Sequence, residues 1–360
     1  MTLRTTRCLR NLIVPALFLA GPSMSAGFPG QSMDADVSTS ASMEASASVA
    51  GQGTFGDLDG DRRADALWRN SADGEIFCWL LNGSTIAAVV PLPQVADLNW
   101  EIKARGDFNG DGTTDLFWRN KTTGQTILWF MSGGGIASWA NSIQVSDLTW
   151  DIVGAGDLDG DGKADVLWRN AVTGDTISWF MNGANVANWA FLPSIGVNWQ
   201  VARLADLDGD GRADIVWRNT VTGENTVWLM NGATIVGSAA LPTTDPALEI
   251  SSVADLDGDG RADILWHDNA TTQSVVWFMN GTQVASTATI YVHPVDDNLR
   301  NLVHWEIRMV ADVNADGKAD ILWRNNLTGE TILWLMNGAS VTSSTPLPTV
   351  SDLNFTLVRP

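Results

Sequence analysis

Six short stretches of the sequence place aspartates at alternate positions, a spacing that suits a metal ion. The motif Asp-x-[Asp/Asn]-x-Asp-x-x-x-Asp begins at Asp57, Asp107, Asp157, Asp206, Asp255 and Asp312. The stretch from Asp157 carries carboxylates at positions 1, 3, 5 and 9, and the backbone carbonyl at position 7 can complete the set. Such oxygen ligands suit Ca²⁺, which takes about six to eight of them, rather than Zn²⁺.

The predicted ligands are the residues at positions 1, 3, 5, 7 and 9 of each loop, for up to six Ca²⁺ ions, one per repeat. They are Asp57, Asp59, Asp61, Arg63 and Asp65; Asp107, Asn109, Asp111, Thr113 and Asp115; Asp157, Asp159, Asp161, Lys163 and Asp165; Asp206, Asp208, Asp210, Arg212 and Asp214; Asp255, Asp257, Asp259, Arg261 and Asp263; and Asp312, Asn314, Asp316, Lys318 and Asp320.

Three loops depart from this pattern. Asn109 and Asn314 replace the carboxylate at position 3, Ala315 follows Asn314, and Arg62 stands at position 6, where the other loops have Gly. Position 12 is Trp168 rather than the Glu of an EF-hand. The alternative is that the aspartates only cap turns, which Asp and Asn favour, although four converging carboxylates without a cation would repel one another.

These loops hold most of the negative charge. The 360 residues include 41 acidic and 21 basic side chains, for a formal net charge of −20. Four loops supply four carboxylates each and two supply three, so that 22 of the 41 acids are predicted ligands. The acidity argues against a nucleic-acid partner, which requires Lys and Arg to neutralise phosphates. With 45% hydrophobic residues, the chain can bury a core.

The loops recur within repeats of about 50 residues. Successive motifs start 50, 50, 49, 49 and 57 residues apart, and the repeat places all 18 tryptophans. One follows each final Asp by three residues (Trp68, Trp118, Trp168, Trp217, Trp266 and Trp323), and another lies eleven residues further (Trp79, Trp129, Trp179, Trp228, Trp277 and Trp334). Four precede a motif by seven residues (Trp100, Trp150, Trp199 and Trp305), and the others are Trp139 and Trp189.

Each repeat predicts four antiparallel strands. In the second repeat they are expected over residues 100–105, 115–120, 126–131 and 135–143. The last turn is Asn-Gly in the other five repeats, a strong signal for a hairpin. A turn centred between Thr123 and Gly124 predicts that Trp118 lies opposite Trp129, and the next turn predicts Trp129 opposite Ile136.

Four-stranded units of this length, apolar on both faces, are typical of propeller blades. The predicted fold is an all-β, six-bladed β-propeller over residues 54–360, with repeats at about 54–99, 100–149, 150–198, 199–247, 248–304 and 305–360. Residues 353–358 resemble the first strand of a repeat, which the first repeat lacks. The C-terminal strand is therefore expected to complete the first blade and close the ring. Seven blades are the alternative.

Residues 1–26 have the order of a secretory signal peptide. Three arginines precede the apolar run 12–20, and small residues follow up to Ala26, the expected cleavage site. The apolar run is shorter than the roughly 20 residues of a membrane span, as is every later one; an uncleaved anchor is the alternative. Residues 27–53, rich in Ser and Ala, are expected to be a flexible linker. The predicted location is extracellular or periplasmic.

The motif Asp-Leu-Asp-Gly-Asp-Gly-[Lys/Arg]-Ala-Asp resembles the FG-GAP (VCBS) repeat of integrin α-subunit propellers and secreted bacterial proteins, over residues 54–358. The resemblance implies calcium between the first two strands of each blade, and adhesion, carbohydrate binding or protein binding on the other face. Integrin-type propellers have seven blades, whereas six motifs occur here. The Trp-Arg-Asn and Trp-x-Met-Asn-Gly motifs are not part of the integrin pattern, so the integrin ligand is not carried over.

The candidate ligand contacts lie in an insertion and on two outer strands. The insertion, within residues 287–304, carries Tyr291, His293 and His304 in a connection between repeats, where binding residues often lie. Trp139 and Trp189 are either platforms for sugar rings or part of the core or edge packing.

Arginines that precede Asn in five repeats (Arg69, Arg119, Arg169, Arg218 and Arg324) have two interpretations. They form either a ring of donors for a polyol or anion, or cross-strand pairs with Glu101, Asp151 and Glu306.

The sequence predicts a binding module rather than an enzyme. It contains neither Gly-x-Ser-x-Gly nor His-Glu-x-x-His. The expected partner is a glycan or a surface protein, as for a lectin or adhesin. A hydrolase or lyase acting on polysaccharide, with its site near residues 287–304, and a purely structural scaffold are the alternatives.

Overall fold

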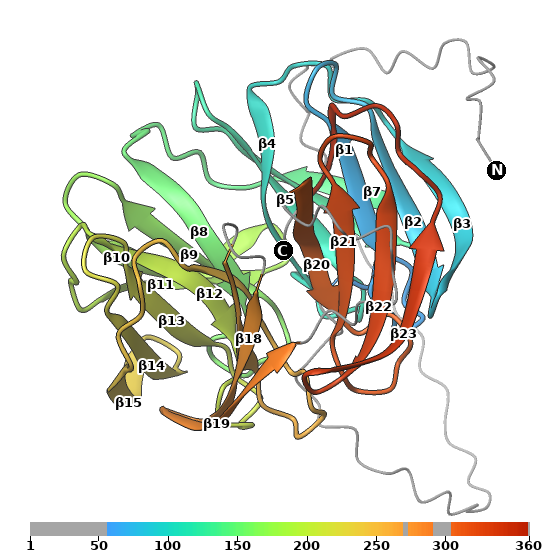
Figure 1. The fold of residues 1–360 in the computed structure, drawn as a ribbon. Helices are drawn as coiled ribbons and strands as arrows, with labels where there is room; N and C mark the ends of the chain where they lie inside the picture. Colours follow the sequence, from blue (N-terminus) through green and yellow to red (C-terminus); the bar gives the residue numbers. More distant parts are fainter. Residues whose placement is uncertain (1–55, 269–272, 291–303, 359–360) are drawn as a thin grey trace, which may run out of the picture.

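The computed structural model describes residues 56–268, 273–290 and 304–358. They form six four-stranded antiparallel sheets, arranged as the blades of a β-propeller (Figure 1). The predictions of an all-β fold and of six blades, rather than seven, are confirmed. The predicted signal peptide and linker, as well as Tyr291 and His293, lie outside the described residues.

The strands of each blade follow one another from the centre of the ring outward. Blade 1 contains β24 (Phe355–Leu357), β1 (Ala66–Asn70), β2 (Ile76–Asn82) and β3 (Thr85–Leu92). Blade 2 contains β4 (Trp100–Gly106), β5 (Asp115–Asn120), β6 (Thr126–Ser132) and β7 (Gly135–Asn141). Blade 3 contains β8 (Trp150–Gly156), β9 (Asp165–Asn170), β10 (Thr176–Asn182) and β11 (Asn185–Leu192).

The other three blades repeat this arrangement. Blade 4 contains β12 (Trp199–Ala205), β13 (Asp214–Asn219), β14 (Asn225–Asn231) and β15 (Thr234–Leu241). Blade 5 contains β16 (Glu249–Ala254), β17 (Asp263–His267), β18 (Ser274–Asn280) and β19 (Gln283–Ile290). Blade 6 contains β20 (Trp305–Ala311), β21 (Asp320–Asn325), β22 (Thr331–Asn337) and β23 (Ser340–Leu347).

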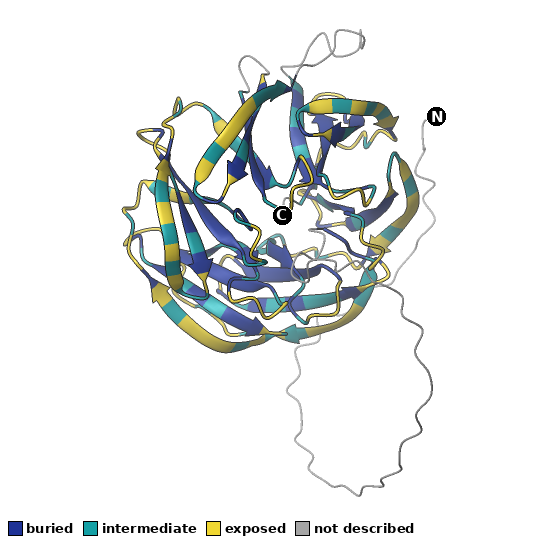
Figure 2. Ribbon diagram, turned by 90° about the horizontal axis from the view of Figure 1, so that it is seen from below, coloured by how far each residue is buried: buried dark blue, intermediate teal, exposed yellow. Residues whose placement is uncertain are grey.

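The hydrophobic core lies between the blades rather than within them. Each second strand is apolar on both faces because a neighbouring blade covers each face, and all six residues of β5, β9, β13 and β21 are buried. One core cluster, for example, joins Phe117 and Leu128 of blade 2 to Val166 and Trp168 of blade 3. The fourth strands form the exposed rim of the ring (Figure 2).

The C-terminal strand closes the ring as predicted. In β24, Phe355 pairs with Asn70 and Leu357 pairs with Trp68 of β1. Both β24 side chains are buried in the cluster that joins blades 6 and 1. The fully buried Arg105 of blade 2 donates to the Val358 carbonyl, so a neighbouring blade also holds this strand.

The predicted register of the tryptophans is wrong. Trp118 lies opposite Ile127, and Trp129 lies opposite Leu116 on one side and Trp139 on the other. The turn after β5 is centred one residue earlier than predicted. The turn after β6 is centred one residue later than predicted, between Gly133 and Gly134, and a β-bulge between Phe130 and Met131 adds one more position to the shift. The rings of Trp118 and Trp129 still contact diagonally, with their centroids 4.8 Å apart.

Candidate metal centres

Five of the acidic loops connect the first and second strands of their blades, and the loop of blade 1 leads into its second strand, β1, because the first strand there is the C-terminal β24. In the loop of blade 3, both carboxylate oxygens of Asp157 accept backbone bonds, from Gly160 N at 2.7 Å and from Gly162 N at 2.8 Å. Asp161 accepts a bond from Lys163 N at 2.9 Å. These bonds curl the loop around its first side chain, so that alternate side chains converge.

The aspartate at position 9 holds the loop to the blade. Asp165 is almost fully buried, and its two oxygens accept bonds from Leu158 N at 3.0 Å and from Met181 N at 2.9 Å. The same pair of bonds occurs at the last Asp of every loop. This residue therefore ties the loop to the third strand, a structural role that the ligand spacing alone did not predict.

Carboxylates gather closely in four loops. Three oxygens, one per side chain, lie within 4.8 Å of one another in each of the following groups: Asp57, Asp59 and Asp61; Asp157, Asp159 and Asp165; Asp206, Asp208 and Asp210; and Asp255, Asp257 and Asp259. The pKa of Asp165 is raised to about 8, chiefly by burial and also by the neighbouring Asp159 and Asp157, although the two backbone bonds lower it. A divalent cation would relieve this repulsion, so these oxygens fit calcium.

The other two loops have an amide in place of one carboxylate. Asn109 Nδ2 donates to Asp111 at 2.9 Å, and Asn314 Nδ2 donates to Asp316 at 3.1 Å. An amide oxygen is a neutral ligand, so these two loops offer one charge fewer to a cation. Calcium affinity depends on the number of charged ligands, and we expect these loops to bind more weakly.

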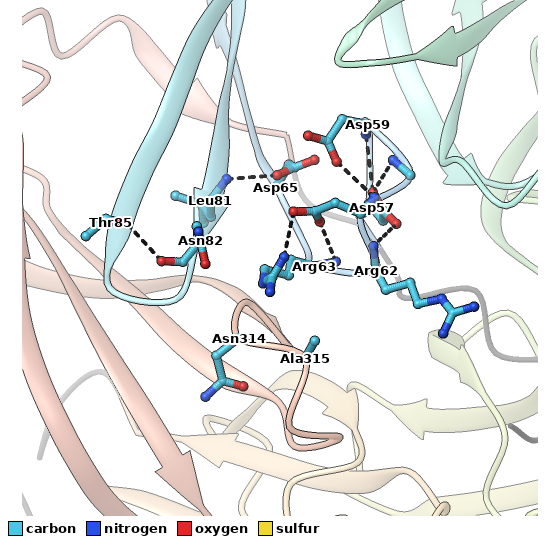
Figure 3. A network of polar contacts seen from close by, with 12 residues as sticks. Asp57, Asp59, Arg62, Arg63, Asp65, Leu81, Asn82, Thr85, Asn314 and Ala315 are labelled. Atoms are coloured by element: carbon cyan, nitrogen blue, oxygen red, sulfur yellow. Dashed lines mark hydrogen bonds and ion pairs between the residues drawn. The ribbon is translucent and has the colours of Figure 1, made fainter. Parts of the chain in front are cut away.

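Two loops also carry backbone strain. Arg62 and Ala315 adopt positive φ, 68° and 61°, where the equivalent residues of the other loops are glycines. A Cβ atom in this left-handed region costs about 1–2 kcal/mol. The two strained loops, of blades 1 and 6, lie next to each other where the ring closes (Figure 3).

Backbone hydrogen bonds join each loop to the next one around the ring. The N–H at position 8 donates to the position 1 carbonyl of the preceding blade, as from Ala213 to Asp157 at 2.6 Å. The hairpin glycine donates to the position 2 carbonyl of the preceding blade, as from Gly232 to Leu158 at 2.7 Å. Both bonds recur at all six boundaries, and Ala64 and Gly83 make them to Asp312 and Val313.

The repeated arginines lie between blades, four of them buried and Arg69 half-buried, and do not form an open ring of donors. Each guanidinium lies over a tryptophan of the next blade, 5.0–5.1 Å from the ring centroid: Arg69 on Trp118, Arg119 on Trp168, Arg169 on Trp217, Arg218 on Trp266 and Arg324 on Trp68. In blade 5, His267 takes the place of the arginine and meets Trp323 edge to face, with the ring centroids 5.4 Å apart. The five cation–π contacts and this ring contact tie the blades together.

The expected cross-strand ion pairs are only partly correct. Glu101, Asp151 and Glu306 lie opposite Arg119, Arg169 and Arg324 in the strand register. However, Glu101 bonds Lys103 and Lys121. Arg119 reaches Asp151 of the next blade at 3.4 Å. Arg169 instead donates to the carbonyls of Gly174, Ile195 and Gly196.

The predicted ligand contacts that the structure describes lie on three blades, of which two, blades 2 and 3, are neighbours. Trp139 and Trp189 lie on the rim with exposed fractions of 60% and 57%, which excludes core packing for them. His304 precedes β20 and is half-buried. Phe191 was not predicted from the sequence. Its side chain is 58% exposed, and its ring centroid lies 5.9 Å from that of Trp189. The signal was present, because residues two apart on a strand share a face.

The fold and loops define a β-propeller with an acidic loop in each blade. A comparison with protein families matches the FG-GAP-like repeat at residues 107–168, 157–217, 206–266 and 255–323, together more than half of the chain. The protein belongs to the FG-GAP-like repeat family, as the motif predicted. No curated protein matches the sequence. Within the described ranges, the structure has no helix with the length and hydropathy of a membrane span.

A solved structure with low sequence identity has a similar fold. The chain is similar to one in the crystal structure of a nidogen/laminin complex, with 14% identity and a TM-score of 0.52, over 82% of this chain and 97% of that chain. It also matches the β-propeller domain of Myceliophteria thermophila Cps50 (Swd1), with 12% identity and a TM-score of 0.44, over 83% of this chain and 88% of that chain.

Proposed function

We propose that the protein is a secreted, calcium-binding propeller that acts as a non-catalytic binding module for an extracellular glycan or protein. The observation that carries the calcium proposal is the convergence of three carboxylates within 4.8 Å in each of four loops. The family match supports it, because the FG-GAP resemblance implies calcium at these residues. Secretion is supported by the predicted signal peptide at residues 1–26.

Calcium would act here as a structural ion. It would neutralise carboxylates that burial and mutual repulsion otherwise destabilise, as the raised pKa values of Asp165 and its equivalents indicate. Because each loop bonds the next blade, an ordered loop would also support its neighbour. The described residues contain one cysteine, Cys78, which is a buried free thiol, so no disulfide stabilises this part of the chain. Calcium would take the stabilising role that disulfides have in many secreted proteins.

The calcium proposal is tested by thermal unfolding of the purified protein in excess calcium and in EDTA. A ligand that binds the native state raises stability by about 2.7 kcal/mol at a hundred times its Kd. We expect a melting temperature that is several degrees lower in EDTA and is restored by added calcium but not by the same concentration of magnesium. Identical melting curves in calcium and EDTA would contradict it.

The binding role is tested separately, with glycan arrays and with capture of extracellular proteins. We expect retention of one ligand class by the calcium-loaded protein. If the protein binds no ligand in either assay but its melting temperature still rises with calcium, a purely structural propeller is favoured.

A further inference from the structure

The rim of the propeller is aromatic on two blades and small or polar on three others. The fifth residue of every fourth strand lies opposite the repeated tryptophan of the third strand. From blade 1 to blade 6, these residues are Val89, Trp139, Trp189, Ser238, Thr287 and Ser344. Since six strands of one geometry accept Val, Trp, Ser or Thr here, the fold does not require the two tryptophans.

The aromatic surface is larger than two side chains. Trp129 and Trp179, which pair with Trp139 and Trp189, are half-buried. The equivalent Trp79, Trp228, Trp277 and Trp334 are at most 9% exposed. Blades 2 and 3 thus each present a pair of adjacent indoles to solvent, and Phe191 extends the pair of blade 3.

The two strands that carry these tryptophans have no charged side chain. Strands β7 and β11 contain no Asp, Glu, Lys or Arg. Their other exposed polar side chains are Ser138, Asn141, Asn185 and Asn188. Ser138 and Asn188 directly precede the tryptophans and point to the opposite face of the sheet. Asn141 follows Trp139 by two residues and shares its face of the sheet.

We propose that the rim of blades 2 and 3, formed by β7 and β11, is the ligand-binding surface, and that its ligand is a neutral polysaccharide. This rests on the proposed role as an extracellular binding module and names its site and ligand class. Flat indole faces fit the C–H faces of pyranose rings, and neighbouring amides can bind sugar hydroxyls. The matching positions on consecutive blades suit a polymer of repeating units.

The absence of charged side chains on β7 and β11 favours a neutral glycan over an anionic polysaccharide or a charged protein surface. An anionic polysaccharide or a basic protein surface would require charged groups at the site, and β7 and β11 supply none. Of the 41 acidic residues, 22 lie in the acidic loops at one end of the blades. The nearest of these to β11, Asp159 and Asp161, share a hollow with Asn188, which is on the opposite face of the strand from Trp189. An uncharged ligand is therefore the one that this surface complements.

The test is native affinity electrophoresis of the full protein in gels that contain laminarin, mannan, xylan or hydroxyethyl cellulose, with alginate as the charged comparison. We expect at least one neutral polysaccharide to retard the protein, with little dependence on salt. The double variant Trp139→Ser and Trp189→Ser carries the residue that blades 4 and 6 have at this position. We expect its dissociation constant to rise at least about tenfold. The control Val89→Ser changes the same position on blade 1 and should bind like the wild type.

Three results would overturn the proposal: no retardation by any neutral polysaccharide, retardation by alginate alone, or equal retardation of the wild type and the double variant. Thermal unfolding of the same samples in calcium shows whether the variants are folded. If the protein binds a glycan or a protein without these tryptophans, the site is wrong while the binding role stands. If calcium has no effect on unfolding, the calcium proposal fails independently of the rim.

Discussion

The second and fourth strands of the same blades have opposite properties. The second strands are buried on both faces, and in five blades they end in Trp-Arg-Asn. The fourth strands have seven or eight residues and each follows a hairpin turn, but their exposed residue opposite the repeated tryptophan changes among Val, Trp, Ser and Thr around the ring. The inner strands meet the same neighbours at every boundary, whereas the outer strands face solvent.

The difference indicates that the inner strands determine the stability of the ring and that the outer strands determine what it binds. A repeated residue such as Arg169 packs on the tryptophan of the next blade, so a substitution there weakens the contact between two blades. A rim residue such as Trp189 contributes little to the ring, so it is free to change with the ligand. We therefore expect inner substitutions to alter stability and rim substitutions to alter binding, and the following predictions test this division.

The largest effect is expected from removing the closing strand. Deletion of residues 353–360 removes Phe355 and Leu357 from the core, at about 1.5–3 kcal/mol each. It also removes carbonyl acceptors of the buried Arg105 and Arg324, and breaking such buried charge interactions costs further stability. We expect loss of the cooperative transition in thermal circular dichroism, whereas Thr356→Ala should melt close to the wild type. A truncated protein that melts like the full chain would show that ring closure does not stabilise the propeller.

The next effect separates two aspartates of one loop. Asp165→Ala leaves the N–H groups of Leu158 and Met181 unpaired, at about 1–3 kcal/mol each, with or without calcium. Asp161→Ala removes an exposed side chain and should reduce only the stabilisation by calcium. Urea unfolding in EDTA and in calcium measures both variants. Equal decreases in the free energy of unfolding of the two variants in EDTA would contradict the role of Asp165 in holding the loop to the third strand.

A smaller effect of opposite sign is expected at the strained loops. Arg62→Gly and Ala315→Gly each relieve a left-handed residue, and the gain exceeds the added freedom of the unfolded chain. We expect each to raise the free energy of unfolding by about 0.5–1 kcal/mol. Gly162→Ala is the matched reverse change, since its φ is 82° and a Cβ there would meet no other atom within 4 Å. Stabilisation by Gly162→Ala would contradict the strain argument.

The last prediction concerns the reactivity of a thiol and involves the smallest change in stability. Burial raises the pKa of Cys78 to about 12, so its reactive thiolate is scarce at pH 8 and shielded from reagents. We expect Cys78 to react with a thiol reagent at pH 8 only after unfolding. Val89→Cys places a cysteine on the rim at a 57% exposed position, and it should react in the native state. Rapid labelling of Cys78 itself, located by mass spectrometry of the native protein, would show that blade 1 opens readily.

The sequence predicted the blades because their determinants are local and repeated. The Asn-Gly turns and the regular spacing of tryptophans fix the strands within a few residues, and residues 353–358 match the missing strand of blade 1. The register of Trp118 and Trp129 was wrong because a bulge and a shifted turn depend on backbone geometry that composition does not encode. A one-residue shift in a turn changes every pair that follows it.

The acidic loops were predicted more fully than their surroundings. Alternate carboxylates are visible in sequence, and the structure gathers them in four loops. The bonds between loops, and the stacking of Arg119 on Trp168 of the next blade, join residues about 50 positions apart. Contacts of this kind depend on how blades pack around the ring, which the spacing within one repeat does not specify.

The most direct test of the account is the calcium content of the protein. After dialysis against about 2 mM calcium, in the range where extracellular modules bind, elemental analysis should find between four and six ions per chain. The four loops with gathered carboxylates should fill first, and dialysis against EDTA should remove all of the ions. Fewer than one calcium per chain after calcium dialysis would contradict the account.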